Sequence, residues 1–213
     1  MRLIWWGQQN YEKIQQLQKE KVVELAGQQQ VEIWGLEFEP TVTLGLRGRR
    51  EQDLKICNDQ QFQVLQTDRG GRATLHSPGQ LVIFPMLDLK SYKIGVQNFV
   101  ELLFRTTQSC LKKYSVESHW KTSEAGVYTS LGKIAFCGLK IDSGVVRHGL
   151  SINISNDLKL FDSLVPCGNS ALSLDRLIDH CNDQASHSLV SPELFLQDWF
   201  ECFSDEWKRV SFS

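Results

Sequence analysis

The most informative part of the sequence reads Arg69-Gly-Gly-Arg-Ala-Thr-Leu-His-Ser-Pro-Gly-Gln-Leu-Val-Ile-Phe-Pro85. A pair of glycines and a Pro-Gly step bracket His76, and an apolar run from Leu81 to Leu87 follows at once. Because glycine has no Cβ, a glycine-rich backbone can come close to a ligand. The apolar run is dense enough to form a buried strand. The stretch therefore predicts a loop that wraps a small molecule and that a rigid strand holds in place, as is common for binding residues.

Two later parts of the chain also combine glycines with apolar residues. The first reads Gly126-Val-Tyr-Thr-Ser-Leu-Gly-Lys-Ile-Ala-Phe-Cys-Gly138, and the second reads His148-Gly-Leu-Ser-Ile-Asn-Ile154. The second is followed, beyond Phe161, by Val165-Pro-Cys-Gly168. One motif of this kind would be weak evidence of function, so the order of the motifs along the chain carries the argument.

In this order, the segments resemble the lipoyl(octanoyl) transferases, which move an octanoyl group from acyl carrier protein to a lysine of a lipoyl domain. The pattern of that family reads roughly Arg-Gly-Gly-x-x-Thr-x-His-Gly-Pro-Gly-Gln, then Lys-Ile-Ala-x-x-Gly, then His-Gly-x-x-x-Asn, then Pro-Cys-Gly. The chain matches nearly every position, over about residues 37 to 170. The resemblance implies a biotin/lipoate protein ligase-like catalytic fold. It also implies octanoyl-[acyl-carrier-protein]:protein N-octanoyltransferase activity, the first step of protein lipoylation.

Length and composition are those of an ordinary globular protein. With 213 residues, we expect residues 1–213 to form a single catalytic domain with a sizeable core. The hydrophobic content is 41%, the charged content is 23%, and a net charge of −2 gives no general attraction to nucleic acid. The N-terminus lacks the features of a signal peptide, and no apolar run approaches the ~20 residues that span a bilayer. We therefore expect a cytoplasmic monomer with no nucleic-acid or membrane partner.

The chain has six cysteines, which are Cys57, Cys110, Cys137, Cys167, Cys181 and Cys202. None lies within four residues of another, so the sequence contains no CxxC-type zinc or redox pair. An even count is compatible with disulfides, but free thiols are expected in a chain of this size with a good apolar core and no secretory signal. The sequence predicts no metal site and no cofactor.

The pattern of apolar and turn residues predicts a mixture of strands and helices. Strands are expected at residues 3–6, 31–38, 64–66, 81–87, 126–128, 133–141 and 150–154. Helices are expected from residue 11 to about residue 26 with Asn10 as cap, over 97–113, and from Ser191-Pro192 onward. The strands at 126–128 and 133–141 form a hairpin around Ser130-Leu-Gly132. Because strands and helices do not alternate strictly, we expect an α+β domain with a mixed β-sheet flanked by helices.

Cys167 is the candidate nucleophile, because a position between proline and glycine suits an irregular turn that exposes the side chain. The alternative is an inert packed cysteine, which is the interpretation kept for the other five. A free thiol has a pKa of ~8.5, so it needs a nearby cation to become a thiolate. Lys133, on a predicted apolar strand, is the candidate cation, and a solvent-facing hairpin lysine is its alternative. The resemblance pairs these two residues, and an apolar pocket would lower the pKa of the lysine.

By the resemblance, three segments contact the acyl group: Arg69, Gly70, Gly71, Arg72, Ala73, Thr74, Leu75 and His76; Phe136, Cys137 and Gly138; and Gly149, Leu150 and Ser151. Backbone N–H groups around Gly70-Gly71 or next to Cys167 are candidate donors to the oxyanion of the reaction. His76 either donates to or positions the acyl carbonyl, or it only hydrogen-bonds the backbone, and these interpretations stay open. Each CH₂ buried in an apolar tunnel contributes ~0.8 kcal/mol, which suffices to capture a medium-length chain.

The chain departs from the family pattern at three places. Ser77 replaces the glycine after His76, and serine tolerates a positive φ poorly. Phe38 stands where the family has a histidine. Phe136 and Cys137 replace smaller or aliphatic residues, and we expect Phe136 to shorten or reshape the acyl tunnel. These departures bear on substrate range and rate rather than on reaction type.

Four functions are compatible with these motifs. The first is octanoyl transfer from octanoyl-acyl carrier protein, through a thioester on Cys167, to lipoyl domains of 2-oxoacid dehydrogenases and the glycine cleavage H protein. An amidotransferase between lipoyl domains would share Cys167 and Lys133, so only the preferred donor distinguishes it. An ATP-dependent lipoate ligase would not need this cysteine, and a non-catalytic acyl-binding protein would need neither residue.

A cluster of arginines precedes the glycine-rich stretch. Arg47, Arg49 and Arg50 form a local basic patch in a slightly acidic chain. The patch is either a solvated loop or a docking site for an acidic carrier protein.

Overall fold

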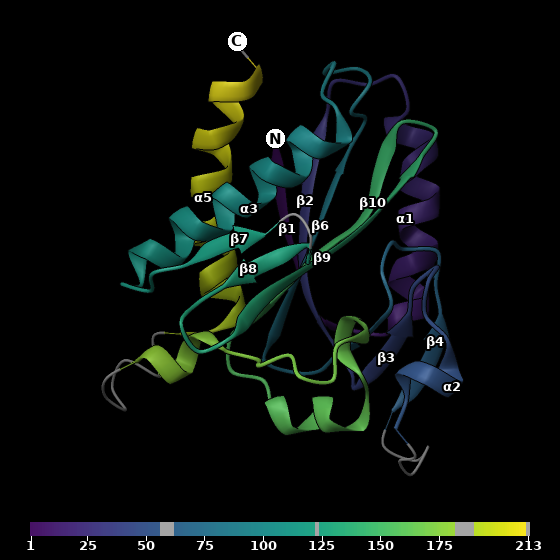
Figure 1. Ribbon diagram of the computed structural model, residues 1–213. Coiled ribbons are helices and arrows are strands. Elements are labelled where there is room, and N and C mark those ends of the chain that lie inside the picture. Colours follow the sequence, from purple (N-terminus) through teal and green to yellow (C-terminus); the bar gives the residue numbers. More distant parts are fainter. Residues whose placement is uncertain (56–61, 122–123, 182–189, 212–213) are drawn as a thin grey trace.

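The computed structural model describes residues 1–55, 62–121, 124–181 and 190–211, and Cys57 lies outside this part of the chain. Within it, seven strands form one sheet in the order β1-β2-β6-β10-β9-β8-β7 (Figure 1). These strands are β1 Arg2–Gln9, β2 Val31–Phe38, β6 Gln80–Leu87, β7 His119–Lys121, β8 Gly126–Tyr128, β9 Lys133–Asp142 and β10 Val145–Asn153. β1 runs parallel to β2, and the other neighbours are antiparallel.

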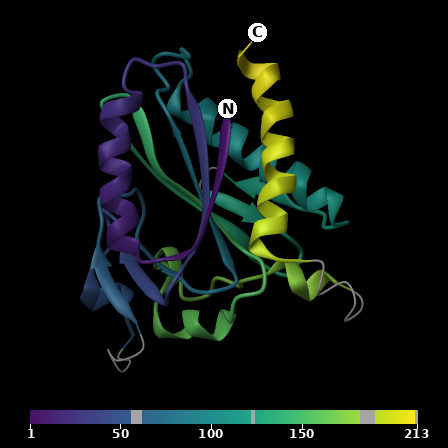
Figure 2. The ribbon, with the colours of Figure 1, turned by 180° about the vertical axis from the view of Figure 1, so that it is seen from behind.

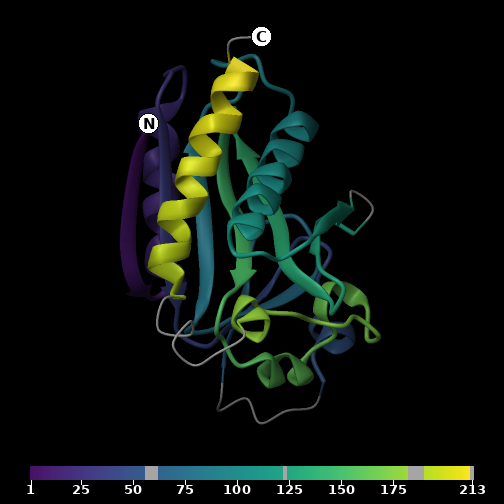
Figure 3. The same cartoon turned by 90° about the vertical axis from the view of Figure 1, so that its left-hand side faces the viewer.

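Helices cover both faces of this sheet (Figures 2 and 3). α1 (Tyr11–Leu25) packs on one face, and α3 (Val96–Lys113) and α5 (Pro192–Ser211) pack against each other on the opposite face. As predicted, Asn10 caps α1 through its side chain, and Ser191 caps α5. Within the described ranges, no helix combines the length and the apolar character needed to cross a bilayer.

A smaller sheet lies beside the first, with the strand order β4-β3-β5 (Figure 1). Its strands are β3 Thr41–Leu44, β4 Gln63–Gln66 and β5 Ala73–His76, and the short helix α2 spans Arg50–Asp53. Three 3₁₀ helices follow the large sheet: η1 Leu158–Ser163, η2 Pro166–Gly168 and η3 Leu177–His180. β5 corrects the expectation of a loop directly before β6, because its residues are buried and pair with β3 in antiparallel fashion.

The longer elements were predicted well. The expected strands at 31–38 and 81–87, the helix at 97–113 and the hairpin of β8 and β9 are all confirmed, with ends that differ by one residue. β10 begins five residues before the predicted strand at 150–154. The short strands β3, β5 and β7 were not predicted. The expected α+β class, with a mixed sheet flanked by helices, is confirmed.

The turn between β5 and β6 accommodates the serine that departs from the family pattern. Gly79, not Ser77, takes the positive φ, at 86°. A Cβ on Gly79 would lie 2.7 Å from the backbone nitrogen of Asn156, so only glycine fits there. Ser77 therefore costs the turn no left-handed strain.

Candidate active site

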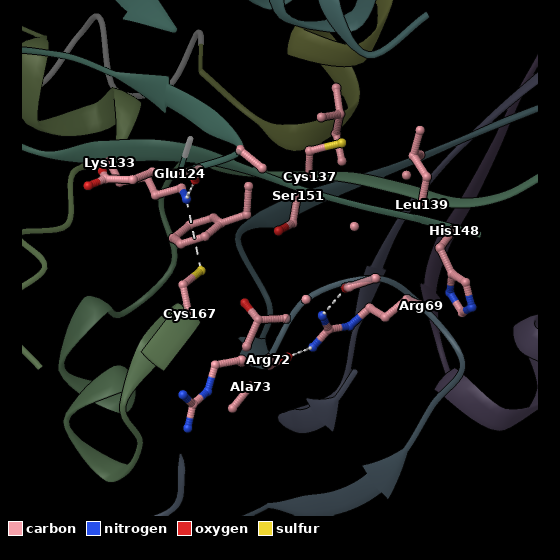
Figure 4. Close-up of a pocket in the computed structure, with 18 of the residues that line it drawn as sticks. Arg69, Arg72, Ala73, Glu124, Lys133, Cys137, Leu139, His148, Ser151 and Cys167 are labelled. Carbon is pink, nitrogen blue, oxygen red and sulfur yellow. Dashed lines mark hydrogen bonds between the residues drawn. The ribbon is translucent and has the colours of Figure 1, made fainter. Parts of the chain in front are cut away.

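A cavity of about 490 Å³ lies where β5, the middle of β9 and β10, and η2 meet (Figure 4). This volume falls within the roughly 300–1,000 Å³ that is usual for small-molecule sites. All of the site residues predicted from the sequence line the cavity except Leu75. Side chains alternate along a strand, so Thr74 and His76 face the cavity while Leu75 is buried in the core of the small sheet. Among the described residues, no group of three or more His, Cys, Asp or Glu side chains could hold a metal ion.

η2 presents the Cys167 side chain to the cavity. Cys167 has a φ of 56° and a ψ of 14°, a left-handed conformation that few residues other than glycine adopt. Val165 N–H donates to the carbonyl of Asp53 at 2.7 Å and so fixes the start of the turn. A Cβ on Gly168 would lie 2.6 Å from Cδ of Arg72, so the turn packs closely on the Arg-Gly-Gly loop. The thiol is exposed, as the Pro-Cys-Gly sequence predicts. Strained backbone of this kind concentrates at functional sites.

Lys133 is the first residue of β9, and only 1% of its surface is exposed. Its Nζ donates to the carbonyl oxygen of Glu124 at 2.5 Å and lies 3.9 Å from Sγ of Cys167 (Figure 4). Burial lowers the pKa of Lys133, and the nearby Cys167 and Glu124 partly oppose that shift. The solvent-facing alternative is therefore wrong. The two atoms that the sequence pairs, the sulfur and the amine nitrogen, face each other across one end of the cavity.

Gly126 lies against the side chain of Lys133, so a substitution of Gly126 tests the placement of the amine beside Cys167. A Cβ on Gly126 would lie 3.0 Å from Nζ of Lys133 and closer still to its Cε. Gly126→Ala is therefore expected to displace the amine from Cys167 and to lower kcat of the acyl transfer by on the order of 10²-fold. Steady-state rates measure the effect.

Gly95→Ala is the matched control, because no atom lies within 4 Å of the Cβ position at Gly95. Its rate is expected to equal that of the unmodified protein. Thermal unfolding of both variants separates a displaced amine from a lost fold. A folded Gly126→Ala protein with full activity contradicts the prediction.

Arg69 holds the shape of the glycine-rich loop. Its guanidinium donates to the side chain and carbonyl of Thr43. It also donates to the carbonyls of Gly70 and Arg72, and Figure 4 shows these two bonds as dashed lines. Arg72 turns away from the cavity centre, and its Nε donates to the buried carboxylate of Asp53 at 2.9 Å. Both arginines line the cavity, but their guanidinium groups hydrogen-bond to other parts of the protein. These contacts stabilise the glycine-rich loop and the turn that carries Cys167.

The structure argues against two of the interpretations of His76, and a role in positioning the acyl carbonyl stays a prediction. Gln80 Nε2 donates to the carbonyl of Leu75 at 3.2 Å and to Oδ1 of Asn153 at 2.9 Å. Gln80 Oε1, 2.8 Å from His76 Nδ1, must therefore accept a proton from that nitrogen. Burial also lowers the pKa of His76 to about 3, so the ring is neutral near pH 7. Its Nε2 is then a lone-pair acceptor that cannot donate to an acyl carbonyl, and its Nδ1 partner is a side chain rather than backbone.

One of the expected oxyanion donors is already occupied. Gly70 N–H donates to the carbonyl of Leu139 at 2.9 Å, which docks the loop onto β9. Gly138 permits this contact, because a Cβ there would lie 2.9 Å from the carbonyl oxygen of Gly70. The N–H of Gly71 donates to no acceptor within the described part of the chain, so it stays a candidate.

Two residues of β9 that depart from the family pattern lie beside Lys133. Phe136 stacks on Phe161 with ring centroids 5.9 Å apart, and its ring centroid lies 5.0 Å from Nζ of Lys133. Cys137 also lines the cavity, but burial raises the pKa of its thiol to about 12. A thiol of this kind stays protonated near pH 7, so Cys137 keeps the expected inert role.

The sequence did not single out the residues at the far end of the cavity. Figure 4 places Cys167 and Lys133 at one end and His148 at the other. His148 Nε2 lies 2.9 Å from Oδ1 of Asp68, and its Nδ1 lies 3.3 Å from the hydroxyl of Tyr11. His148 opens a recognised motif, which was a usable signal. Tyr11 follows a helix cap and carries no motif, so only the fold reveals that it lines the cavity.

Sequence comparison finds close relatives along nearly the whole chain. The family of the lipoyl protein ligase A/B catalytic domain matches residues 10–196. An octanoyltransferase of Dichelobacter nodosus is 34% identical over 203 residues, which are 95% of this chain and 97% of that protein. An octanoyltransferase of Shewanella piezotolerans is 37% identical over 168 residues, which are 79% of this chain and 75% of that protein.

Solved structures share the fold at low sequence identity. Lipoate-protein ligase A bound with ATP matches with a TM-score of 0.76 and 12% identity, over 97% of this chain and 85% of that chain. A bi-partite lipoate protein ligase from Thermoplasma acidophilum matches with a TM-score of 0.75 and 10% identity, over 97% and 83%. The biotin/lipoate protein ligase-like fold implied by the motifs is thereby confirmed. The chain belongs to the lipoyl protein ligase A/B catalytic domain family and, within it, to the acyltransferases named octanoyltransferase.

Proposed function

We propose that this protein transfers an octanoyl group from octanoyl-acyl carrier protein to a lysine of a lipoyl domain, through a thioester on Cys167. The observation that supports it most is the 3.9 Å between Sγ of Cys167 and Nζ of Lys133 at one end of the cavity. We infer that the acyl group is octanoyl because the relatives are named octanoyltransferases. A binding protein would need neither the strained, exposed thiol nor the buried amine.

The first half-reaction is a thioester exchange. The buried amine of Lys133, in its neutral form, takes the proton of the Cys167 thiol. The sulfur attacks the carbonyl carbon of the octanoyl thioester, and an oxyanion forms that the Gly71 N–H can stabilise. The intermediate collapses, the carbon–sulfur bond to the carrier breaks, and the carrier thiolate takes the proton from Lys133. One thioester replaces another, so the step requires no ATP.

The second half-reaction forms the amide. The neutral amine of the acceptor lysine attacks the octanoyl carbonyl on Cys167, and the bond from that carbon to sulfur breaks as the nitrogen–carbon bond forms. Lys133 accepts the proton that the new amide nitrogen loses. Cys167 leaves as a thiolate and takes this proton from Lys133, which returns the site to its starting state of thiol and neutral amine. A lowered pKa suits Lys133 to both proton transfers, because it raises the neutral fraction of the amine above that of an exposed lysine at the same pH.

The rest of the cavity would hold the acyl chain. Apolar side chains of β6 and β10 line it between the reactive end and His148, among them Val82, Phe84 and Leu150. Each methylene buried there contributes about 0.8 kcal/mol. The acceptor is proposed as a lipoyl domain, since the related archaeal ligase was solved as a lipoylation system together with its E2 lipoyl domain.

Intact mass spectrometry of a mixture of this protein with octanoyl-acyl carrier protein tests the proposal. We expect a mass increase of one octanoyl group that maps to Cys167, and transfer of that group on addition of a lipoyl domain. No ATP should be needed. Absence of the adduct under turnover contradicts the mechanism.

The same mixture separates the other functions. An octanoylated lipoyl domain that is the better donor identifies an amidotransferase. A strict need for ATP and free acid identifies a ligase. Acyl binding without transfer identifies a non-catalytic protein.

The arginine cluster at the start of α2 lies beside the reactive end. Arg47 lines the cavity and is exposed, and its N–H donates to the carbonyl of Gly71 at 3.0 Å. Reversing Arg47, Arg49 and Arg50 to glutamate is expected to raise KM for octanoyl-acyl carrier protein by about 10-fold with kcat unchanged, since charges at a rim govern encounter more than chemistry. Initial rates at several salt concentrations measure this.

A second triple charge reversal, at three basic residues of α3 and α5, controls for the change in net charge. Lys112 on α3 and Lys208 and Arg209 on α5 are exposed and lie off the cavity. Their reversal should leave KM for the carrier unchanged. Equal KM values in the two triple variants would show that the arginine cluster is only a solvated loop.

A further inference from the structure

Two buried aspartates hold the segment that carries Cys167. Upstream, the carbonyl of Asp53 accepts the N–H of Val165 at 2.7 Å, just before η2. Downstream, the chain returns to the large sheet at Asp175, whose side chain is 1% exposed. Residues 167–171, between the two anchors, are all exposed, and the contact of Gly168 with Arg72 is their close approach to the rest of the site. The position of the Cys167 sulfur therefore depends on these anchors.

The backbone around Asp175 docks on the first residue of β9. Asp175 N–H donates to the carbonyl of Lys133 at 3.0 Å, and Lys133 N–H donates to the carbonyl of Ser173 at 2.9 Å. Leu174 thus forms a parallel bridge with Lys133. Gly132 allows the approach, because a Cβ there would lie 2.6 Å from the backbone of Ser173. The segment that carries the thiol and the strand that carries the amine meet at this point.

The carboxylate of Asp175 ties this docking point to the turn between β8 and β9. Its Oδ2 accepts a hydrogen bond from the hydroxyl of Thr129 and another from Nε2 of His180, at 2.7 Å. Its Oδ1 accepts the N–H of Arg176 at 2.8 Å. The Thr129 hydroxyl also accepts the N–H of Leu131 at 3.1 Å, so the carboxylate and the turn form one network. A buried carboxylate is costly unless it is partnered in this way, and here its partners join three separate segments.

We propose that Asp175 is a positioning residue for acyl transfer, which keeps Sγ of Cys167 within reach of Nζ of Lys133 by fixing the Cys167 segment to the β8–β9 turn. The inference rests on the proposed function, because it presumes that the thiol and the amine act together. Asp175 does not line the cavity, so it acts only through these two residues. Neither Asp175 nor Thr129 belongs to the motif positions that identify the family.

Four variants test the proposal on the intact protein. Asp175→Ala is expected to lower kcat by on the order of 10- to 100-fold, since small misplacements of reacting groups have effects of this size, with little change in KM. Asp175→Asn should restore part of the loss, because it keeps an oxygen for the N–H of Arg176. Thr129→Val removes one partner hydroxyl at almost constant volume and should lower kcat in the same direction. Asp179→Asn is the control, because Asp179 is an exposed carboxylate that pairs with Arg176 and does not line the cavity.

A second readout separates positioning from general destabilisation. The rate at which iodoacetamide alkylates Cys167 is measured across ~pH 5–10, with the adduct located by mass spectrometry. The pH profile of Asp175→Ala should move toward that of Lys133→Met, while Asp179→Asn keeps the original profile. Thermal unfolding shows which variants are folded at the assay temperature. If Asp175→Ala is not folded, Thr129→Val carries the same comparison.

The outcomes distinguish this inference from the proposed function. A folded Asp175→Ala protein with the original kcat overturns the inference. A fall in kcat of Asp175→Ala with an unchanged pH profile of alkylation also overturns the inference. In that case, the amine of Lys133 would still lie beside the Cys167 thiol. Full turnover by Cys167→Ser would instead overturn the proposed function.

Discussion

Cys167→Ser is expected to lose octanoyl transfer to a lipoyl domain by at least about 10³-fold, because a covalent nucleophile has no substitute within the cavity. Serine fits the same exposed turn, whose left-handed backbone does not depend on the sulfur. Its hydroxyl stays protonated near neutral pH and attacks a thioester slowly. Initial rates from octanoyl-acyl carrier protein, followed by intact mass, measure the loss. The octanoyl adduct on the enzyme should disappear with the activity.

Cys202 supplies the control for this experiment. It lies on α5, outside the cavity, and a hydrogen bond with Cys110 lowers the pKa of Cys202 to about 7. Its lowered pKa therefore makes Cys202 a thiol on which non-specific acylation is expected. Cys202→Ser should transfer octanoyl at the original rate, because its sulfur does not face the amine of Lys133. An adduct only on Cys202, or full turnover without Cys167, contradicts a thioester at Cys167.

Local patterns were enough to predict the long elements, and the resemblance to the family was enough to pair Cys167 with Lys133. β6 is an eight-residue strand in which every residue is buried, and α3 has a clear apolar stripe, so both were visible in the sequence. Cys167 and Lys133 were paired through motifs, and the structure brings their atoms to 3.9 Å. Glycines at Gly126 and Gly168 mark the close approaches that make this possible.

The remaining features depend on partners that are distant in the sequence. β3 and β5 are four-residue strands that pair within the small sheet, β3 with both β4 and β5, and no local periodicity reveals so short a strand. The tautomer of His76, on β5, is set through Gln80 on β6 and Asn153 on β10. No motif marks Asp175, and only the fold places it beside Lys133. Hydrogen-bond partners of this kind follow from topology rather than from composition.

Lys133→Met is expected to lower octanoyl transfer by on the order of 10²- to 10⁴-fold, the usual contribution of a positioned acid–base group. Methionine fills most of the same volume but cannot take a proton from the thiol or from the acceptor amine. In the unmodified protein, the rate should rise with pH through the lowered pKa of Lys133, as its neutral fraction grows. That rise should be absent from the variant. Rates at several pH values measure both effects, and Lys140→Met, on the half-buried part of β9, is the matched control.

Lys133→Met should lower activity without lowering the stability of the fold near pH 7. Because burial lowers the pKa of Lys133 below 10.5, the folded chain releases this proton more easily than the unfolded chain does. Between the lowered pKa and 10.5, the unfolded state binds more protons than the folded state does. The contribution of Lys133 to the free energy of unfolding therefore rises with pH across this window. Below the window, the cost of burying the charged amine is present in full. Lys133→Met removes the penalty, and the exposed Glu124 can turn its freed carbonyl to water. The unfolding midpoint of the variant near pH 7 should therefore match or exceed that of the unmodified protein, with the difference shrinking toward pH 10.5. A variant that is inactive and also clearly less stable near pH 7 would mean that the amine is held for the fold rather than for the chemistry.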